Sequence, residues 1–321
     1  MLDKRSEGVL QIMNNNWNTK TLLEAVGLTA LIAIFTIMGF YIPAGMLLMV
    51  FLCSVTLVVL IVRTNERVVV PVVIVIYALI FFVTGDAFTS AIIVSSFGFS
   101  GLALGWGFKR RKDFRSLFIL SSSAYLLTLL LAFFLSNLVH NINLINVFIL
   151  DPMEQFFIQL EKEAENVAQI LGTSFISAAE LAQLKNTISF FVPGFLLLVS
   201  SFFGYITLML SKSVLNGMKY DYKYLPMFSQ LKVGKATVSV FVLSFLLSII
   251  ITDSVISAAL LNITLILSMV LGLCGLSVID FFIKRYGIPG IVRIIIYIIG
   301  FVITMLVGLL IPIIHPSNIL T

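Results

Sequence analysis

Charged side chains are scarce in this sequence, and their scarcity limits what the chain can be. Asp, Glu, Lys and Arg make up 11% of its 321 residues, hydrophobic residues make up 60%, and the mean hydropathy is +1.13. Soluble domains are about one quarter charged. An ordinary soluble domain is therefore excluded, and we expect no nucleic acid among the partners.

Cysteine and histidine are almost absent, with two of each in the chain. Cys53 and Cys274 fall in apolar segments, where cysteine behaves as a small core residue, so we expect no disulfide. His140 and His315 have no partner at metal-ligand spacing, and the chain has no HExxH or CxxC motif. We therefore expect no locally built metal site and no cofactor.

Motifs of catalysis are missing as well. Gly234-Lys235-Ala236 resembles a phosphate-binding loop, but position 229 is Ser and position 236 is neither Ser nor Thr. Gly85-Asp86 and Tyr220-Asp221 resemble the paired aspartates of intramembrane proteases, yet we predict them on opposite membrane faces, about 30 Å apart. We identify no catalytic residue and expect a protein that is not an enzyme.

Long apolar windows, in contrast, recur along the whole chain, and about 20 such residues are enough to cross a bilayer. We predict an all-α, polytopic integral membrane helical bundle with a single transmembrane domain over 21–314. A cytoplasmic N-terminal segment, 1–20, precedes it and a C-terminal tail, 315–321, follows. No cleavable signal peptide is expected, because the first apolar stretch is too long. The nine predicted transmembrane helices lie at about 21–42, 45–62, 68–84, 87–107, 116–138, 187–211, 236–252, 256–282 and 289–313.

One segment, 140–186, interrupts the series of spans. Asp151-Pro152 is typical of a helix start, and apolar side chains follow it at helical spacing, opposite a row of acidic ones. A helix of this kind is too polar to cross the membrane and lies at its surface. We predict an extracytoplasmic, amphipathic helical insertion at the outer face, in which 151–171 would form a lid.

The basic residues predict the orientation of the chain. With the N-terminus inside, 18 of the 20 lysines and arginines fall in inner segments, and only Lys162 and Lys185 fall outside. This bias follows the positive-inside rule, and it makes 212–235 a cytoplasmic basic loop. The inner basic residues are Lys4, Arg5, Lys20, Arg63, Arg67, Lys109, Arg110, Arg111, Lys112, Arg115, Lys212, Lys219, Lys223, Lys232, Lys235, Lys284, Arg285 and Arg293.

Few acidic residues qualify as binding candidates. Asp86 and Asp253 lie at predicted outer turns, so each is either a turn residue in water or a contact to a ligand. Asp280 precedes Lys284 by four residues, the spacing of an ordinary ion pair within a helix. Glu24 lies within a turn of the predicted inner boundary, from which a long side chain reaches the headgroups.

Small residues recur four positions apart on three of the predicted spans, the last of them with Gly300, Thr304 and Gly308. Ala25, Thr29 and Ala33 form such a face on the first span, and Gly101 and Gly105 form one on the fourth. Faces of this kind let two helices approach closely. They serve either packing within the chain or docking of another membrane protein.

Two stretches of the C-terminal half carry a family resemblance: LPMFSQLKVGK from Leu225, and LNITLILSMVLGLCGLSVIDFFIKRYGIPGIVR from Leu261. With the layout of the N-terminal half, they resemble the YybS-like family (DUF2232) of bacterial membrane proteins. That family is similar to the substrate-binding S components of energy-coupling-factor vitamin transporters, whose first helix docks a partner membrane subunit through small residues. The resemblance thus implies a bacterial cytoplasmic membrane location. It also implies docking of an energising membrane subunit through the first span. A membrane-bound cyclic-dinucleotide phosphodiesterase, whose gene often lies beside those of family members, is the alternative, signalling partner.

Two functions follow as expectations. In the first, the chain is a non-enzymatic transporter component that binds a small molecule from the outer side. In the second, it is a scaffold or signalling partner that binds no ligand and holds another protein through 212–235.

Overall fold

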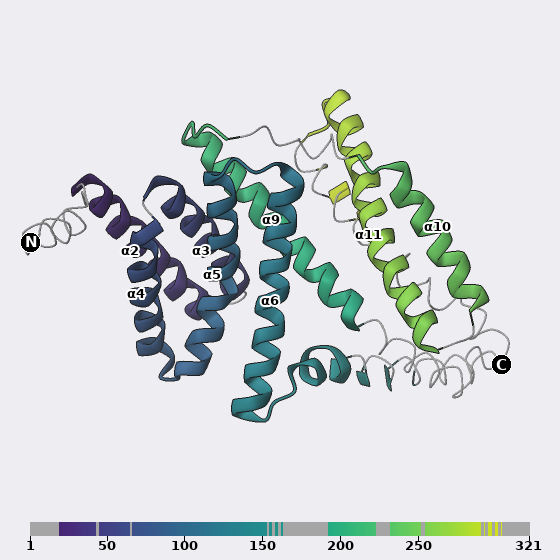
Figure 1. Ribbon diagram of the computed structural model, residues 1–321, viewed down its shortest axis with the longest axis horizontal. Coiled ribbons are helices and arrows are strands. Elements are labelled where there is room, and N and C mark those ends of the chain that lie inside the picture. Colours follow the sequence, from purple (N-terminus) through teal and green to yellow (C-terminus); the bar gives the residue numbers. More distant parts are fainter. Residues whose placement is uncertain are drawn as a thin grey trace, which may run out of the picture. The chain divides into compact units, whose positions relative to one another are not determined.

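The computed structural model describes residues 19–42, 45–64, 66–152, 192–222, 232–251 and 254–289, with single positions between 154 and 162 and between 292 and 303. All regular structure in these residues is helical, as predicted (Figure 1). The elements are α2 (Thr19–Tyr41), α3 (Gly45–Arg63), α4 (Glu66–Thr84), α5 (Ala87–Lys109), α6 (Phe114–His140), the π-helix η1 (Asn146–Leu150), α9 (Val192–Gly217), α10 (Lys235–Ile250) and α11 (Ser254–Arg285).

Six of the described helices are long and apolar enough to cross a membrane: α2, α3, α5, α6, α9 and α11. The apolar parts of two others, Val68–Thr84 in α4 and Lys235–Ile250 in α10, are shorter. A polytopic helical membrane protein is therefore confirmed. The count of nine stays a prediction, because most of 289–313 lies outside the described residues.

The chain forms two compact units, which we describe separately. Unit 1 comprises Met1–Thr128 and Phe203–Lys223, and unit 2 comprises Leu129–Phe202 and Tyr224–Thr321. Helices α6 and α9 each contribute one part to unit 1 and the other to unit 2.

In unit 1, α3 is buried along most of its length and packs closely against α5. A Cβ added to Gly101 would lie 2.8 Å from the Cβ of Leu57, and one added to Gly105 would lie 2.8 Å from the Cβ of Ile61. No side chain fits at such distances, so glycine is required at both positions for the two helices to approach.

The turn between α4 and α5 follows from two adjacent residues. Gly85 has φ of +68°, in the left-handed region that glycine adopts without strain, and it ends α4. Asp86 then caps α5: its carboxylate accepts hydrogen bonds from the backbone N–H groups of Phe88 (3.4 Å) and Thr89 (2.7 Å). The turn that the sequence predicts here is confirmed.

Helix α5 ends on a left-handed residue that is not glycine. Arg111 has φ of 49°, its N–H donates to the carbonyl of Phe108, and the N–H of Lys112 donates to that of Gly107. This pair of bonds is a Schellman motif. Helix α9 ends in the same way at Lys219, with φ of 55°, beyond the membrane-spanning part of the helix.

Two predicted boundaries need correction. Helix α9 continues to Gly217, so the basic loop does not begin at Lys212, which lies in the helix. Asp151 does not begin a helix, because it has helical backbone angles and follows η1 directly. Asn143 caps that segment instead, accepting from the N–H groups of Ile145 (3.0 Å) and Asn146 (3.4 Å). The rest of the predicted insertion lies mostly outside the described residues.

In unit 2, polar contacts join helices that are otherwise apolar. Ser244 of α10 and Thr264 of α11 share a hydrogen bond of 2.9 Å. Asn262 of α11 accepts from the backbone N–H of Gly194 in α9 at 2.9 Å. The predicted pair in α11 is confirmed, with Lys284 Nζ 2.7 Å from a carboxylate oxygen of Asp280, whose side chain is wholly buried.

Candidate functional site

Four hydroxyl groups from four helices meet inside unit 1. Ser54 of α3 and Ser100 of α5 share a hydrogen bond of 2.8 Å, and the hydroxyls of Ser54 and Tyr125 of α6 lie 3.4 Å apart. Tyr125 in turn shares a bond of 2.7 Å with Thr207 of α9. All four residues are buried. We call Ser54, Ser100, Tyr125 and Thr207 the hydroxyl cluster.

The hydroxyls of the cluster are tolerated within apolar helices because each serine or threonine also bonds to a backbone carbonyl. Thr207 donates to the carbonyl of Phe203, while Ser54 and Ser100 both reach that of Phe97. The ring of Phe203 packs edge-on against that of Tyr125, with centroids 5.8 Å apart. Polar groups so far from water are stable only when they find partners.

Three other hydroxyls on α6 and α9 find no partner. The Oγ atoms of Ser121, Ser122 and Ser211 are buried and make no hydrogen bond to the part of the chain that the structure describes. Ser122 lies where the two helices come close, because a Cβ on Gly204 would be 2.8 Å from both its backbone nitrogen and its Oγ. A buried polar group without a partner costs about 1–3 kcal/mol, so a water, an ion or a ligand that bonded to these hydroxyls would stabilise the protein.

Basic segments far apart in the sequence meet at one end of unit 1. Lys109 Nζ donates to the carbonyl of Thr64 at 3.0 Å, which ties the turn after α5 to the link between α3 and α4. Arg111 forms an ion pair of 2.6 Å with Asp221, which follows α9. We call residues 109–115 the basic turn.

A third contact completes this end of unit 1. Glu24, near the start of α2, lies 3.7 Å from a guanidinium nitrogen of Arg63 at the end of α3. The turn at Gly85-Asp86 lies at the other end of α5 (Figure 1). Segments that the charge bias predicts on the inner side therefore share one end of the unit.

Tyr222 lies beyond the end of α9 and packs against the basic end of α5. Its ring is edge-on to Phe108, with centroids 5.7 Å apart, and its hydroxyl donates to the side chain of Asn216. Burial raises the pKa of the Tyr222 hydroxyl above its usual value, and the bond to Asn216 opposes that rise.

The structure places some of the acidic residues singled out from the sequence and leaves others undescribed. Asp86 is the cap of α5, which accounts for its position without a ligand; a role in ligand binding stays a prediction. Asp253 lies outside the described residues. Asp86 and Asp221 lie at opposite ends of α5, a helix of 23 residues and thus about 35 Å long, so they cannot share a proton.

The small-residue candidates mostly face the interior. Gly101 and Gly105 are covered by α3 of the same chain. Ala25 is 3% exposed and belongs to the core of unit 1, whereas Thr29 and Ala33 are half-buried. Their docking of a partner stays a prediction.

Sequence reasoning missed the hydroxyl cluster. Serine and threonine are common in membrane helices, so Ser54, Ser100 and Thr207 give no signal by type. Tyr125 does give one, because tyrosine is enriched at membrane surfaces and here lies in the interior of a span. Among the described residues no group of three or more His, Cys, Asp or Glu is placed to hold a metal ion.

Comparison with known proteins identifies the family of the chain. Residues 30–313 match a family described as "Predicted membrane protein (DUF2232)". The chain belongs to this family. It is also similar to the protein of Bacillus subtilis (strain 168) named "Uncharacterized protein YybS", with 23% identity over 289 residues, covering 88% of this chain and 91% of that protein. No solved structure matches the chain. The resemblance to the YybS-like family is therefore confirmed, and the further similarity to S components stays a prediction.

Proposed function

We propose that the chain is a non-enzymatic membrane component that binds a small polar solute within unit 1 and works with an energising partner. The observation that carries this proposal is the set of buried hydroxyls of Ser121, Ser122 and Ser211, which have no hydrogen-bond partner among the described residues. They lie on α6 and α9, the helices that also supply Tyr125 and Thr207 to the hydroxyl cluster. A solute bearing hydroxyl or carbonyl groups would satisfy them.

The partner would dock on α2, as a similarity to S components would imply. Helix α2 packs against α3 through Ile32 and Thr36, while Leu23 and Val26 on another face are exposed. The chain would lie in the cytoplasmic membrane with its N-terminus inside. The meeting of Arg63, Lys109 and Arg111 at one end of unit 1 supports this orientation.

Serine-to-alanine variants test whether a solute is bound, because a bound solute and an unpaired hydroxyl predict opposite changes in melting temperature. If Ser121 and Ser211 contact a solute that stays bound during purification, S121A and S211A lower the melting temperature. If these hydroxyls have no partner, the same variants raise it, because alanine removes a buried unpaired group. Ser123, exposed on α6 and bonded to the carbonyl of Leu120, gives the matched control S123A, which should change little.

Mass spectrometry of the purified protein completes this test. A small molecule that leaves with denaturation of the wild-type chain, and is depleted in S121A and S211A, identifies the solute. Raised melting temperatures together with the absence of such a molecule would overturn the proposal.

The second candidate function is a scaffold without a ligand, and the Arg111–Asp221 pair favours it. That pair fixes the residues that enter the basic loop after α9, so the loop starts from a defined position. A stable complex of the purified chain with another protein, free of any small molecule, would select this function.

A further inference from the structure

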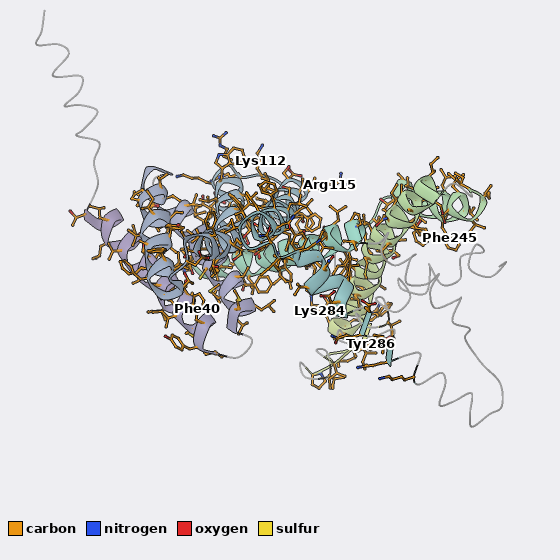
Figure 2. The ribbon with its side chains drawn as sticks, turned by 90° about the horizontal axis from the view of Figure 1, so that it is seen from below. Phe40, Lys112, Arg115, Phe245, Lys284 and Tyr286 are labelled. Atoms are coloured by element: carbon orange, nitrogen blue, oxygen red, sulfur yellow. The ribbon has the colours of Figure 1, made fainter. Side chains whose placement is uncertain are left out.

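The five cations of the basic turn differ in whether they have a bonded partner. Lys109 is bound to the carbonyl of Thr64 and Arg111 to Asp221. Arg110, Lys112 and Arg115 are exposed, and the structure pairs none of them with a carboxylate among the residues it describes. In Figure 2, Lys112 and Arg115 lie along the same edge of unit 1.

Two of these three cations make cation–π contacts with the same aromatic ring. The guanidinium carbon of Arg110 lies 4.4 Å from the ring centroid of Trp106, and Nζ of Lys112 lies 5.9 Å from it. Cation–π contacts of this kind are attractive, but they leave the N–H groups of both cations available to an anion. Asp113 directly precedes α6, and its carboxylate accepts from the hydroxyl of Ser116 at 2.8 Å, so this acid is engaged at the start of the helix and offsets the helix dipole there.

The surroundings of the ring indicate the kind of anion. Trp106 lies three residues before the end of α5, at the depth where tryptophan marks the boundary between headgroups and hydrocarbon. On α6, Arg115 is followed at helical spacing by Ile119, which is 64% exposed, and further along by Leu127, 51% exposed. Arg115 thus stands at the start of an exposed face of α6 that is apolar at Ile119 and Leu127 and carries Ser123 between them, a face on which an acyl chain can lie.

We propose that Trp106, Arg110 and Lys112, with Arg115 beside them, bind the headgroup of an anionic phospholipid. The phosphodiester would accept from the guanidinium of Arg110 and the ammonium of Lys112, and an acyl chain would follow the exposed face of α6. An acidic protein segment would need the cations but not the apolar face beneath them, so a lipid fits both observations.

Fluorescence quenching by brominated lipid tests the site. Trp17 and Trp106 are the two tryptophans, so W17F leaves Trp106 as the single reporter. The protein is placed in phosphatidylcholine vesicles that contain brominated phosphatidylglycerol, or in vesicles with the same fraction of brominated phosphatidylcholine. We expect stronger quenching by brominated phosphatidylglycerol, which reports enrichment of that lipid at the ring.

Variants separate a defined site from the general attraction of a basic surface. Each cation removed from the site, as in R110Q or K112Q, should reduce the preference for phosphatidylglycerol about fivefold. R110K keeps the charge and should retain much of the preference. The matched control K235Q/R285Q removes two exposed cations from α10 and α11 and should retain all of it.

Three outcomes would overturn the proposal. Equal quenching by the two brominated lipids excludes enrichment at Trp106. An equal loss of preference in K235Q/R285Q indicates a diffuse charge effect. A response of Trp106 to added polyglutamate but not to phosphatidylglycerol would instead assign the surface to an acidic protein.

Discussion

The guanidinium of Arg111 lies 2.6 Å from the carboxylate of Asp221, although 110 positions separate the two residues in the sequence. Both side chains are largely exposed, at 63% and 79%, and an exposed pair of this kind contributes at most about 1 kcal/mol. The backbone of Arg111 opposes part of this gain, because its φ of 49° is costly for any residue with a Cβ.

Substitutions at Arg111 separate these two effects. R111A and R111G both remove the ion pair, but only glycine removes the strain of the left-handed backbone. We expect R111G to be more stable than R111A by about 1 kcal/mol, measured by thermal unfolding in detergent. D221N, which keeps the strain and weakens the pair, should lose no more than about 1 kcal/mol. Equal stability of R111A and R111G would contradict the left-handed ending of α5.

Glycine-to-alanine substitutions along α5 should differ sharply in effect. G105A brings a Cβ within 2.6 Å of Ile61 Cδ1, and G101A brings one within 3.0 Å of the carbonyl oxygen of Ser54. Both should destabilise the protein by about 1–3 kcal/mol. G98A is the control, because its Cβ would be 3.9 Å from Val94 and alanine favours a helix by up to about 1 kcal/mol. A stability of G105A equal to that of G98A would show that α3 and α5 are not in contact there.

The bond between Tyr125 and Thr207 can be measured by a double-mutant cycle. Y125F and T207V each remove one hydroxyl while keeping most of the side-chain volume. We expect a coupling energy of about 0.6 kcal/mol, and no more than about 1.7 kcal/mol, in thermal or denaturant unfolding. Additive effects of the two substitutions would mean that the hydroxyls do not bond in the membrane.

Tyr222 should titrate at higher pH than an ordinary tyrosine. Burial favours its neutral form, so its contribution to stability is complete below pH about 10 and is lost as the pH rises through the folded-state pKa. The phenolate absorbance of the wild type minus that of Y222F isolates this residue among the nine tyrosines. The midpoint of that difference should lie above 10. A midpoint at or below 10 would contradict the burial of Tyr222 against Phe108.

Single cysteines at the two ends of α5 test the orientation. In a background without Cys53 and Cys274, A87C should react with a membrane-impermeant thiol reagent in intact cells, and K112C should react only after lysis. Cysteines within 155–185 should behave like A87C. Labelling of K112C from outside would reverse the predicted orientation of the whole chain.

The positions of the helices could be predicted because their signals are local. Apolar windows mark the spans, and Gly85-Asp86 carries both the left-handed residue and the helix cap at a single turn. The cap of the segment after α6 was misassigned because Asn143 and Asp151 are both good caps, and sequence alone does not choose between them. The sequence did not predict how α5 and α9 end, because Arg111 and Lys219 adopt a left-handed backbone conformation that their residue types do not favour.

The candidate site could not be predicted, because it depends on which helix faces meet. Ser54, Ser100 and Thr207 come from three helices, and nothing within any one helix relates them. The grouping of basic residues at one end of unit 1 was predictable from charge alone. Their division into bound cations, such as Lys109, and available ones, such as Lys112, required the contacts.

The close contact of α3 with α5 limits how unit 1 can move. Where Gly101 meets the Cβ of Leu57, only the side chains of one helix separate the two backbones, so α3 and α5 have little room to slide past each other. Any rearrangement during a functional cycle must then shift elements that meet them through longer side chains. In unit 1, Tyr125 of α6 reaches Ser54 of α3 through its hydroxyl, and Phe203 of α9 packs its ring against that of Phe51. Contacts between such longer side chains can adjust, so shear of these parts of α6 and α9 across the α3–α5 pair is the motion that this packing favours.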